Sequence, residues 1–351
     1  MKVDFLIVGQ GIAGTSFAFE LLRRNKSFII IDNYISNSPS RVALGIYNPL
    51  ILKWFTKPWF VDEQLKHFYS FYQDFNKFLN QEYVYDIGIY KLLKTSYDQN
   101  NWLTKSTSDS RKQYMSPELY SINNDNLINK EFYGLVKSAG RVNVPLLLES
   151  FRHFCIASNK LIQEVFDYNE LSFKEDFVKF KDIEAKNIIF CQGPNLKSNP
   201  FFNYINLNPT KGELLKIYCK GLELKKIFHS RFLFIPLGAD YYSIGATYDW
   251  ENLNDMSPTV EAQKKMANQL DQLINLPYTI IEQKVGLRPS TLDRRPLLGA
   301  HLEYKNMYIL NGLGTRGILL APYLSKCLLD NIYLGTPFSS EVNVSRFSRN
   351  S

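Results

Sequence analysis

The sequence contains few of the residues that metal sites and disulfide frameworks need. Only four cysteines and four histidines occur among 351 residues, and their spacing matches neither a zinc motif nor a small disulfide scaffold. We therefore expect no metal centre and no disulfide framework, as is typical of a protein of the reducing cytoplasm. Apolar runs are all shorter than the roughly 20 residues that a membrane-spanning helix requires, so we expect no membrane segment.

Charge and hydropathy are those of an ordinary globular protein. Hydrophobic residues make up 45% and charged residues 21% of the chain, with a formal net charge of +7. The excess of positive charge is compatible with an anionic partner such as RNA but does not require one. The length allows two domains with a large core.

The first 32 residues contain the most informative pattern. Residues 4–8 (DFLIV) form an apolar run of strand length, and the turn Gly9-Gln10-Gly11-Ile12-Ala13-Gly14 follows it directly. The residues after this turn have the apolar spacing of a helix, and a second apolar run then ends in Asp32. The order is strand, glycine turn, helix, strand and acid, which is the arrangement of a dinucleotide-binding fingerprint.

Each conspicuous residue of this fingerprint has a physical role. Gly9 permits the tight turn, Gly11 lets a pyrophosphate approach the backbone, and Gly14 lets helix and strand pack closely. Asp32 follows Gly14 by 18 residues, near the roughly 20 expected of the acid that accepts a hydrogen bond from a ribose hydroxyl. The first 32 residues alone leave NAD and FAD open, and the alternatives are a mononucleotide site or a fold that has lost its ligand site.

Later segments predict an α/β fold (α+β overall) with two interleaved domains. An apolar run that ends at Gly193 repeats the strand-to-glycine pattern of the N-terminus, and ligands bind at such carboxyl ends of parallel strands. We assign a Rossmann-like nucleotide-binding domain to residues 1–57, 134–205 and 284–351. Residues 58–133 and 206–283 contain strand-like runs without alternating helices, so we assign them to a mostly antiparallel β substrate domain.

Five motifs in order give the chain a resemblance to a known family. They are VGQGIAG with Asp32, FCQGP, IGATYD, GLRPSTLDRRPLLG and GLGTRGILLAP. Together they resemble the D-amino-acid oxidase (DAO) family of FAD-dependent amine oxidoreductases over nearly the whole chain, which implies non-covalently bound FAD. VALGIYNPL and GLGTRGILLAP look most like the FAD domain of the bifunctional enzyme that matures 5-methylaminomethyl-2-thiouridine in tRNA. Glycine oxidase is also similar.

The resemblance implies roles for two arginines. Arg288, in GLRP, matches the arginine that binds a substrate carboxylate, and a guanidinium suits that task because it donates two parallel hydrogen bonds. A salt bridge between the domains is the alternative for Arg288. Arg316 stands at the start of the last helix, where its charge would act on the flavin ring; a surface position is its alternative. Glycine oxidases place an arginine one residue earlier, where this chain has Thr315.

The cofactor residues implied by the motifs come from five parts of the chain. They are Gly9, Gly11, Gly14, Asp32, Ser40, Arg41, Gly45, Val165, Gly193, Gly312, Gly314, Arg316 and Gly317. Tyr242 and Tyr248 are candidates for the substrate pocket, although a core position is the alternative for each.

The resemblance implies an enzyme that oxidises a C–N bond with FAD. One candidate substrate is a secondary amine bearing a carboxylate, such as carboxymethylaminomethyl-uridine in tRNA. Another is free glycine, sarcosine or a D-amino acid, with an oxidase or a dehydrogenase as the catalyst. A protein of another class, which holds FAD without catalysis and binds a partner, is the remaining alternative.

Overall fold

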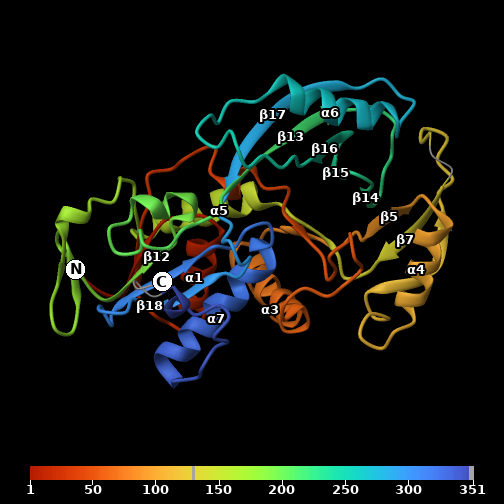
Figure 1. Cartoon of the computed structure of the whole chain (residues 1–351). Helices are drawn as coiled ribbons and strands as arrows, with labels where there is room; N and C mark the ends of the chain where they lie inside the picture. The colour runs from red at the N-terminus through yellow and green to blue at the C-terminus, as the bar shows by residue number, and fades with distance from the viewer. Residues whose placement is uncertain (129–130, 348–351) are drawn as a thin grey trace.

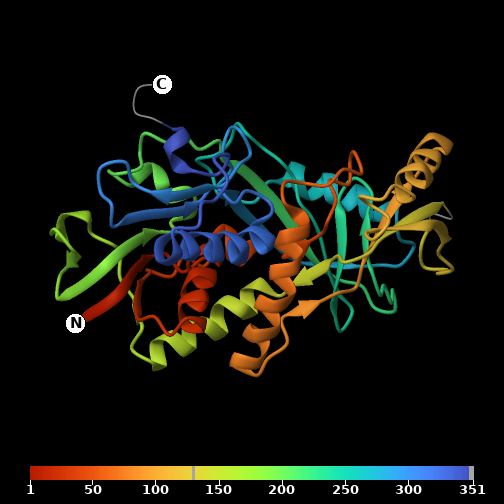
Figure 2. The ribbon, with the colours of Figure 1, turned by 90° about the horizontal axis from the view of Figure 1, so that it is seen from below.

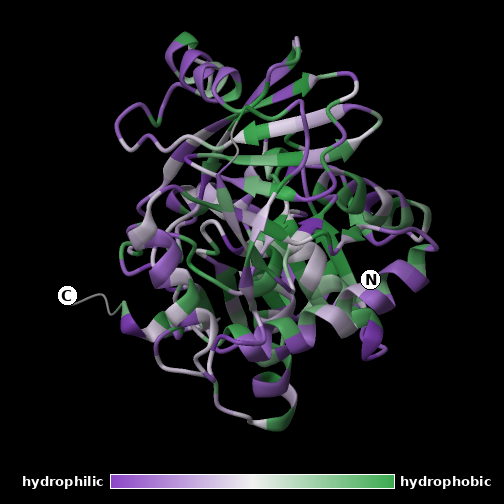
Figure 3. Cartoon of the chain, turned by 90° about the vertical axis from the view of Figure 1, so that its right-hand side faces the viewer, coloured by the Kyte–Doolittle hydropathy of each residue, from purple (hydrophilic) through white to green (hydrophobic). Residues whose placement is uncertain are grey.

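The computed structural model describes residues 1–128 and 131–347. The chain folds around two large sheets, one on each side of a central region where the chain crosses repeatedly (Figure 1). Hydrophobic residues follow the strands, and hydrophilic residues gather on the outer helices and loops (Figure 3). No helix in the described part of the chain is both long and apolar enough to span a membrane.

The first sheet is built on parallel strands around the N-terminal fingerprint. β1 (Lys2–Val8) pairs in parallel with β2 (Phe28–Ile31) and β12 (Ile183–Phe190), and β12 pairs in parallel with β19 (Met307–Asn311). The other strands of this sheet are β9 (Leu161–Ile162), β10 (Leu171–Phe173), β11 (Val178–Phe180) and β18 (Leu297–Ala300).

Both faces of β1 are buried, as in most parallel sheets. Phe5 and Ile7 pack in the hydrophobic cluster that includes the helices, whereas Leu6 and Val8 pack in a second cluster with Phe190. Alternate residues of a strand point to opposite faces of the sheet. The continuous apolar run of β1 is therefore explained by cover on both sides.

Several long helices contribute to the hydrophobic cluster that contains Phe5 and Ile7. α1 (Ile12–Arg23) begins at the glycine turn, and α7 (Gly317–Leu334) runs beside it (Figure 2). α5 (Val144–Ala157) has Pro145 in its first turn, where a missing backbone N–H costs nothing. The N-termini of α1 and α7 both lie near the ends of the parallel strands, which places two helix dipoles beside one region.

The second sheet has eight strands and is antiparallel except where β14 pairs with β5. Its strands, in spatial order, are β17 (Thr279–Arg288), β13 (Thr210–Tyr218), β16 (Tyr241–Gly245), β15 (Leu233–Gly238), β14 (Ile227–His229), β5 (Ile89–Leu93), β7 (Phe132–Val136) and β6 (Met115–Ser121). α6 (Val260–Asp271) covers one part of this sheet, and α4 (Ser96–Ser106) lies at its far end (Figure 1). The antiparallel character expected for residues 206–283 is thus confirmed.

Short elements connect the two large sheets. α2 (Pro39–Val42) leads into β3 (Ile46–Tyr47), which forms a three-stranded sheet with β8 (Gly140–Val142) and β4 (Val84–Tyr85). Every strand of the first sheet comes from the segments predicted to bind nucleotide. β7 and β17 of the second sheet cross the predicted boundaries by a few residues, and the division into two domains stays a prediction.

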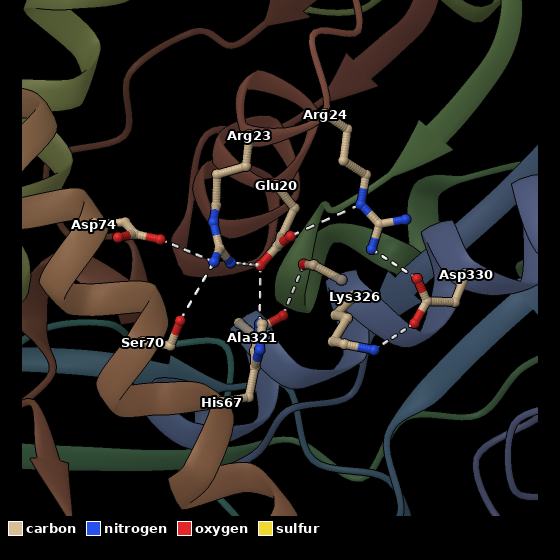
Figure 4. A network of polar contacts seen from close by, with 10 residues as sticks. Glu20, Arg23, Arg24, His67, Ser70, Asp74, Ala321, Lys326 and Asp330 are labelled. Carbon is tan, nitrogen blue, oxygen red and sulfur yellow. Dashed lines mark hydrogen bonds and ion pairs between the residues drawn. The ribbon is translucent and has the colours of Figure 1, made fainter.

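α3 (Val61–Leu79), which belongs to a segment assigned to the substrate domain, packs against α1 and α7. Figure 4 shows the polar network at this junction: the buried Glu20 carboxylate lies 2.9 Å from His67 Nε2 and 2.8 Å from Arg23 Nη1. Arg23 also contacts Asp74 of α3 at 2.9 Å. The cations around Glu20 offset the cost of burying a carboxylate, so the network fixes α3 on the first sheet's helices.

Candidate active site

A cavity of about 610 Å³ lies where the parallel strands of the first sheet end. Val8, Ile31, Cys191 and Asn311 line it, and each stands at or directly after the carboxyl end of a strand. Residues of the second sheet close the opposite side, among them Gly212. This volume falls within the roughly 300–1,000 Å³ of small-molecule sites.

The structure brings most of the predicted site residues to this one cavity. Those that line it are Gly9, Gly11, Asp32, Ser40, Arg41, Gly45, Val165, Gly193, Tyr248, Arg288, Gly314 and Gly317. They come from segments that are up to about 300 residues apart in sequence, and the two sheets bring them together.

Close backbone contacts require glycine at two positions of the fingerprint, Gly9 and Gly14. Gly9 has φ +101°, and a Cβ there would lie 2.6 Å from the carbonyl oxygen of Cys191. A Cβ at Gly14 would lie only 1.9 Å from the carbonyl oxygen of Gly9, which accounts for the tight packing of helix on strand. At Gly11 the nearest atom is Ser40 Oγ at 3.1 Å, so the loop stays open to a ligand on that side.

Asp32 is held by three hydrogen bonds at the end of β2. Its carboxylate accepts from the backbone N–H of Gln10 at 2.8 Å, from the backbone N–H of Tyr34 at 2.9 Å and from Arg152 Nη1 at 2.7 Å. The side chain of Arg152, on α5, is only 3% exposed. This ion pair fixes the position of the carboxylate that the fingerprint assigns to a ribose hydroxyl.

The sequence analysis missed Arg152. The signal that points to it is a charged residue in register with the buried positions Leu148, Phe151 and Cys155 of a helix. A charge on such a face needs a partner, but the sequence does not identify Asp32, which lies 120 residues away, as that partner.

Ser40 and Arg41 lie beside the N-terminus of α1. The Ser40 hydroxyl accepts from the backbone N–H of Ile12 at 3.1 Å. The buried Arg41 guanidinium donates to Glu149 at 3.0 Å and to the side-chain oxygen of Gln10 at 3.2 Å. A polar and positive rim therefore surrounds the free N–H groups of the helix, which suits a pyrophosphate.

Three further cofactor candidates also line the cavity, namely Gly45, Val165 and Gly193. Gly45 has φ +70°, and a Cβ would lie 1.9 Å from the carbonyl oxygen of Val142. Gly193 has φ +56°, and its carbonyl oxygen accepts from Asn311 Nδ2 at 3.0 Å. The side chain of Val165 is 71% exposed at the cavity edge, so its backbone is accessible to a ligand.

The C-terminal glycine loop divides into two parts. Gly314 and Gly317 face the cavity, and a Cβ at Gly317 would lie 3.2 Å from Ile12 Cγ2, so glycine lets the starts of α7 and α1 approach each other. Gly312 is buried instead, where a Cβ would lie 2.9 Å from the methyl group of Thr291. Gly312 is not among the residues that line the cavity, and its contact with a cofactor stays a prediction.

Arg316 stands at the start of α7 as expected, but it points away from the cavity lining. Its Nη2 donates to the carbonyl oxygen of Asn48, while its buried Nε has no hydrogen-bond partner. Burial lowers the pKa of Arg316 to about 10. That the charge of Arg316 acts on a bound flavin ring stays a prediction.

Arg288 is the positive group on the substrate side of the cavity. Both its Nη atoms donate to the carbonyl oxygen of Thr247 at 3.3 Å, and its guanidinium carbon lies 4.6 Å from the centre of the Tyr248 ring. Within residues 1–128 and 131–347 no carboxylate lies within ion-pair distance of it. Burial lowers the pKa of Arg288 from its usual value. A buried guanidinium with only a carbonyl partner is a strong site for an anion.

The two tyrosine candidates have different surroundings. Tyr248 lines the cavity and is 57% exposed. Tyr242 is buried in the core of the second sheet, where its ring lies 5.4 Å from that of Phe234. The structure thus corrects the expectation that Tyr242 belongs to the pocket, and the core alternative holds for it.

The residues that line the cavity suit a dinucleotide. Within the described residues no group of three or more His, Cys, Asp or Glu is placed to bind a metal ion. By contrast, the open N–H groups of α1, the rim of Ser40 and Arg41, and the carboxylate of Asp32 provide the contacts that pyrophosphate and ribose need. These residues would hold the ADP half of FAD, and the loops at Gly45 and Gly314 would lie beside its ring.

Comparison with known proteins identifies the family. The family described as FAD dependent oxidoreductase (DAO) matches residues 4–330. Glycine oxidase of Bacillus licheniformis is 24% identical over 97% of this chain and 95% of its own length. The tRNA 5-methylaminomethyl-2-thiouridine biosynthesis bifunctional protein MnmC of Campylobacter fetus is 25% identical over 87% of this chain, which spans about half (48%) of that relative.

The fold of the chain is also that of solved oxidases. Iminodiacetate oxidase from Chelativorans sp. BNC1 superposes with a TM-score of 0.79 over 98% of both chains, at 19% identity. The chain belongs to the DAO family: it is an FAD-dependent oxidoreductase that acts on C–N bonds.

Proposed function

We propose that the protein oxidises the C–N bond of an amine that carries a carboxylate, with Arg288 binding the carboxylate. The observation that supports this most directly is the state of the Arg288 guanidinium, which lines the cavity and, within residues 1–128 and 131–347, donates only to the Thr247 carbonyl oxygen. A substrate carboxylate would accept two charge-assisted hydrogen bonds there.

FAD, when bound, supplies the acceptor for the hydride that leaves the carbon beside the nitrogen. The chain's own contribution is to orient the substrate: Arg288 fixes the carboxylate end, and Tyr248 covers one side of the guanidinium. Among the described residues that line the cavity, Tyr248 is the titratable one that contacts Arg288, and the lining carboxylates Asp32 and Glu164 form no ion pair with it. The amine therefore binds in its neutral form, and oxidation accelerates as the pH rises through the pKa of the substrate amine.

The substrate we propose is an N-substituted glycine unit. The relatives suggest two forms of it, a free small amine or a modified base of tRNA. Glycine oxidase is a relative over almost its whole length, whereas MnmC is named for a modified uridine of tRNA. The net charge of +7 supports binding of RNA, since phosphate contacts favour basic proteins. We further propose a reducing, cytoplasmic setting, which four unpaired cysteines support.

The test is an anaerobic titration of the FAD-loaded protein, in which loss of the oxidised flavin's visible absorbance is followed. Glycine, sarcosine, a panel of D-amino acids and tRNA carrying the carboxymethylaminomethyl group are added in turn. Bleaching by sarcosine or glycine assigns a free-amine substrate, and bleaching by tRNA alone assigns the modified base. A yellow protein that none of them bleaches refutes the proposed substrate class.

A further inference from the structure

The segment that joins β16 to α6 forms the wall of the cavity beside Arg288. We call residues 247–259 the wall segment, of which Tyr248 and Met256 line the cavity. Two groups that contact the Arg288 guanidinium belong to this segment. The carbonyl oxygen of Thr247 accepts from both Nη atoms at 3.3 Å, and the centre of the Tyr248 ring lies 4.6 Å from the guanidinium carbon. The position of the wall segment therefore affects the position of the guanidinium.

Lys211 of β13 ties the wall segment to the second sheet. Its backbone exchanges two hydrogen bonds with Asp249, at 2.9 and 3.0 Å. The Lys211 side chain is only 1% exposed, and such a buried ammonium costs free energy unless a partner compensates it. Its Nζ donates to the carbonyl oxygen of Ser257 at 3.1 Å, and among the described residues no carboxylate lies within ion-pair distance of it. The wall segment therefore supplies the hydrogen-bond acceptor of this buried charge.

The charge of Lys211 also acts on two carboxylates of the wall segment, Asp249 and Asp255. The pKa of Asp249 is below its ordinary value, chiefly because the backbone N–H of Glu251 donates to it, and the pKa of Asp255 is low chiefly because Ser257 donates to it. In both cases the Lys211 ammonium adds to the lowering. Since opposite charges attract beyond contact distance, removal of the ammonium would weaken the attachment of an acidic segment.

Glu213, two residues along β13, holds the two ends of the wall segment. Its carboxylate, which is 4% exposed, accepts from the backbone N–H and the hydroxyl of Thr259 at 2.9 and 2.8 Å and from Gln283 Nε2 at 2.7 Å. The Glu213 backbone N–H donates to the Thr247 hydroxyl at 2.9 Å, and its carbonyl oxygen accepts from the Thr247 N–H at 3.0 Å. Three successive residues of β13 thus meet either the wall segment or Arg288.

These three residues divide between the two faces of the strand. Successive positions of a strand point to opposite faces. Gly212 lines the cavity on the face where the Arg288 guanidinium packs, so Lys211 and Glu213 point to the other face. We propose that Lys211 is a positioning residue for the carboxylate site, because its ammonium holds the wall segment against which Arg288 packs. This inference rests on the proposed function, in which Arg288 binds the substrate carboxylate.

The first test measures binding, so it does not depend on turnover. (Methylthio)acetate keeps the carboxylate of sarcosine and has sulfur in place of the amine nitrogen, and (methylthio)acetamide is its neutral counterpart. Dissociation constants are measured on the FAD-loaded protein from changes in the visible flavin spectrum. The wild type is expected to bind the acid more tightly than the amide.

Lys211→Met removes the ammonium and keeps an unbranched side chain. It is expected to weaken the acid about tenfold and the amide by no more than about twofold, because the guanidinium is displaced. In the Arg288→Ala background it should have no further effect. Glu213→Gln, which places an amide N–H against groups that donate, should act in the same direction and replaces Lys211→Met if that variant does not fold.

Lys216→Met is the matched control. Lys216 belongs to the same strand, but its Nζ lies over the Tyr241 ring at 4.7 Å. The substitution removes the same charge without a change at the wall segment, and is expected to alter neither affinity. Equal weakening of acid and amide by Lys211→Met, or an additive loss in the Arg288→Ala background, overturns the inference.

Hydrogen exchange separates failure of the inference from failure of the proposed function. In Lys211→Met the backbone N–H groups of Thr247, Asp249 and Thr259 are expected to exchange about tenfold faster than in the wild type, because their segment opens more often. Unchanged exchange, or faster exchange with an unchanged affinity for the acid, refutes the positioning role. If the wild type binds acid and amide equally, the proposed function fails, and faster exchange would then still show that Lys211 holds the wall segment.

Discussion

The Arg288 guanidinium lies against the backbone of Gly212, closer than any side chain at position 212 permits. A Cβ at Gly212 would be 2.2 Å from Arg288 Nη2 and 2.5 Å from the guanidinium carbon. In the register of β13 and β17, Arg288 pairs with Thr210, so its side chain runs diagonally to Gly212, two residues further along β13. Gly212 therefore provides the space that holds the proposed carboxylate site in position.

Gly212→Ala is expected to displace the Arg288 side chain and raise the KM for carboxylate substrates about tenfold or more. FAD content stays unchanged, because position 212 does not touch the fingerprint loop. The check is steady-state kinetics with the double variant Gly212→Ala/Arg288→Ala. If Gly212 acts through Arg288, its substitution has no further effect once Arg288 is gone; additive losses would show that it acts elsewhere.

The local features of the site were predictable from the sequence because their causes are local. A glycine turn between an apolar run and a helix is recognisable from neighbouring residues alone. The contacts of Gly9 and Gly14 agree with the predicted tight turn and close packing of helix on strand. By contrast, the direction of Arg316 depends on Asn48, 268 residues away. The partner of Arg152 is likewise far away in the sequence, because Asp32 precedes it by 120 residues. Side-chain direction set by tertiary contacts has no signature in a single sequence.

The tyrosines show the same limit. Tyr242 and Tyr248 both follow the strand pattern near IGATYD, yet only Tyr248 reaches the cavity. The difference arises because Tyr242 lies within β16 in a hydrophobic cluster, with its ring next to that of Phe234, while Tyr248 lies beyond the strand's end. Burial of a strand face depends on what packs over it, and the sequence does not state that.

Alanine substitutions at Gly14 and Gly11 are expected to have different effects on stability and FAD binding. At Gly14 the new Cβ meets a backbone oxygen at 1.9 Å, which cannot move without separating helix and strand. Gly14→Ala should therefore lower the Tm and yield protein without FAD. At Gly11 the neighbour is the Ser40 hydroxyl at 3.1 Å, which can rotate. Gly11→Ala should fold normally but bind FAD more weakly, as measured by flavin release and thermal melting.

Arg152→Leu is expected to destabilise the protein by about 2–4 kcal/mol, because it leaves the largely buried Asp32 carboxylate without its cation. Denaturant unfolding of the apoprotein measures the loss. Asp32→Asn in the same chain should recover part of it. Lys2→Ala, which removes a surface ion pair with Glu184, serves as the control and should have little effect. Equal effects of the two substitutions would contradict the role given to Arg152.

Asp4 is expected to stabilise the fold in a pH-dependent way. Partial burial raises the pKa of Asp4, but hydrogen bonds from Lys186 and Ser27 lower it by more than burial raises it. The net result is a pKa of about 2. Because the folded pKa is below the unfolded value of 3.8, the contribution is present above pH 3.8 and is lost as the pH falls towards 2. Solvent screening reduces it to about 1 kcal/mol. Asp4→Asn should lower the unfolding free energy at pH 7 by that amount and leave it unchanged near pH 2.

The central claim is that Arg288 recognises the substrate carboxylate, and the rate of flavin reduction tests it most directly. The rate is measured anaerobically for an N-substituted glycine and its carboxamide, with wild type, Arg288→Ala and Arg288→Lys. The wild type should prefer the carboxylate about 100-fold, since two charged hydrogen bonds contribute about 3 kcal/mol. Arg288→Ala should abolish that preference, and Arg288→Lys should keep part of it. An undiminished preference in Arg288→Ala would contradict the account.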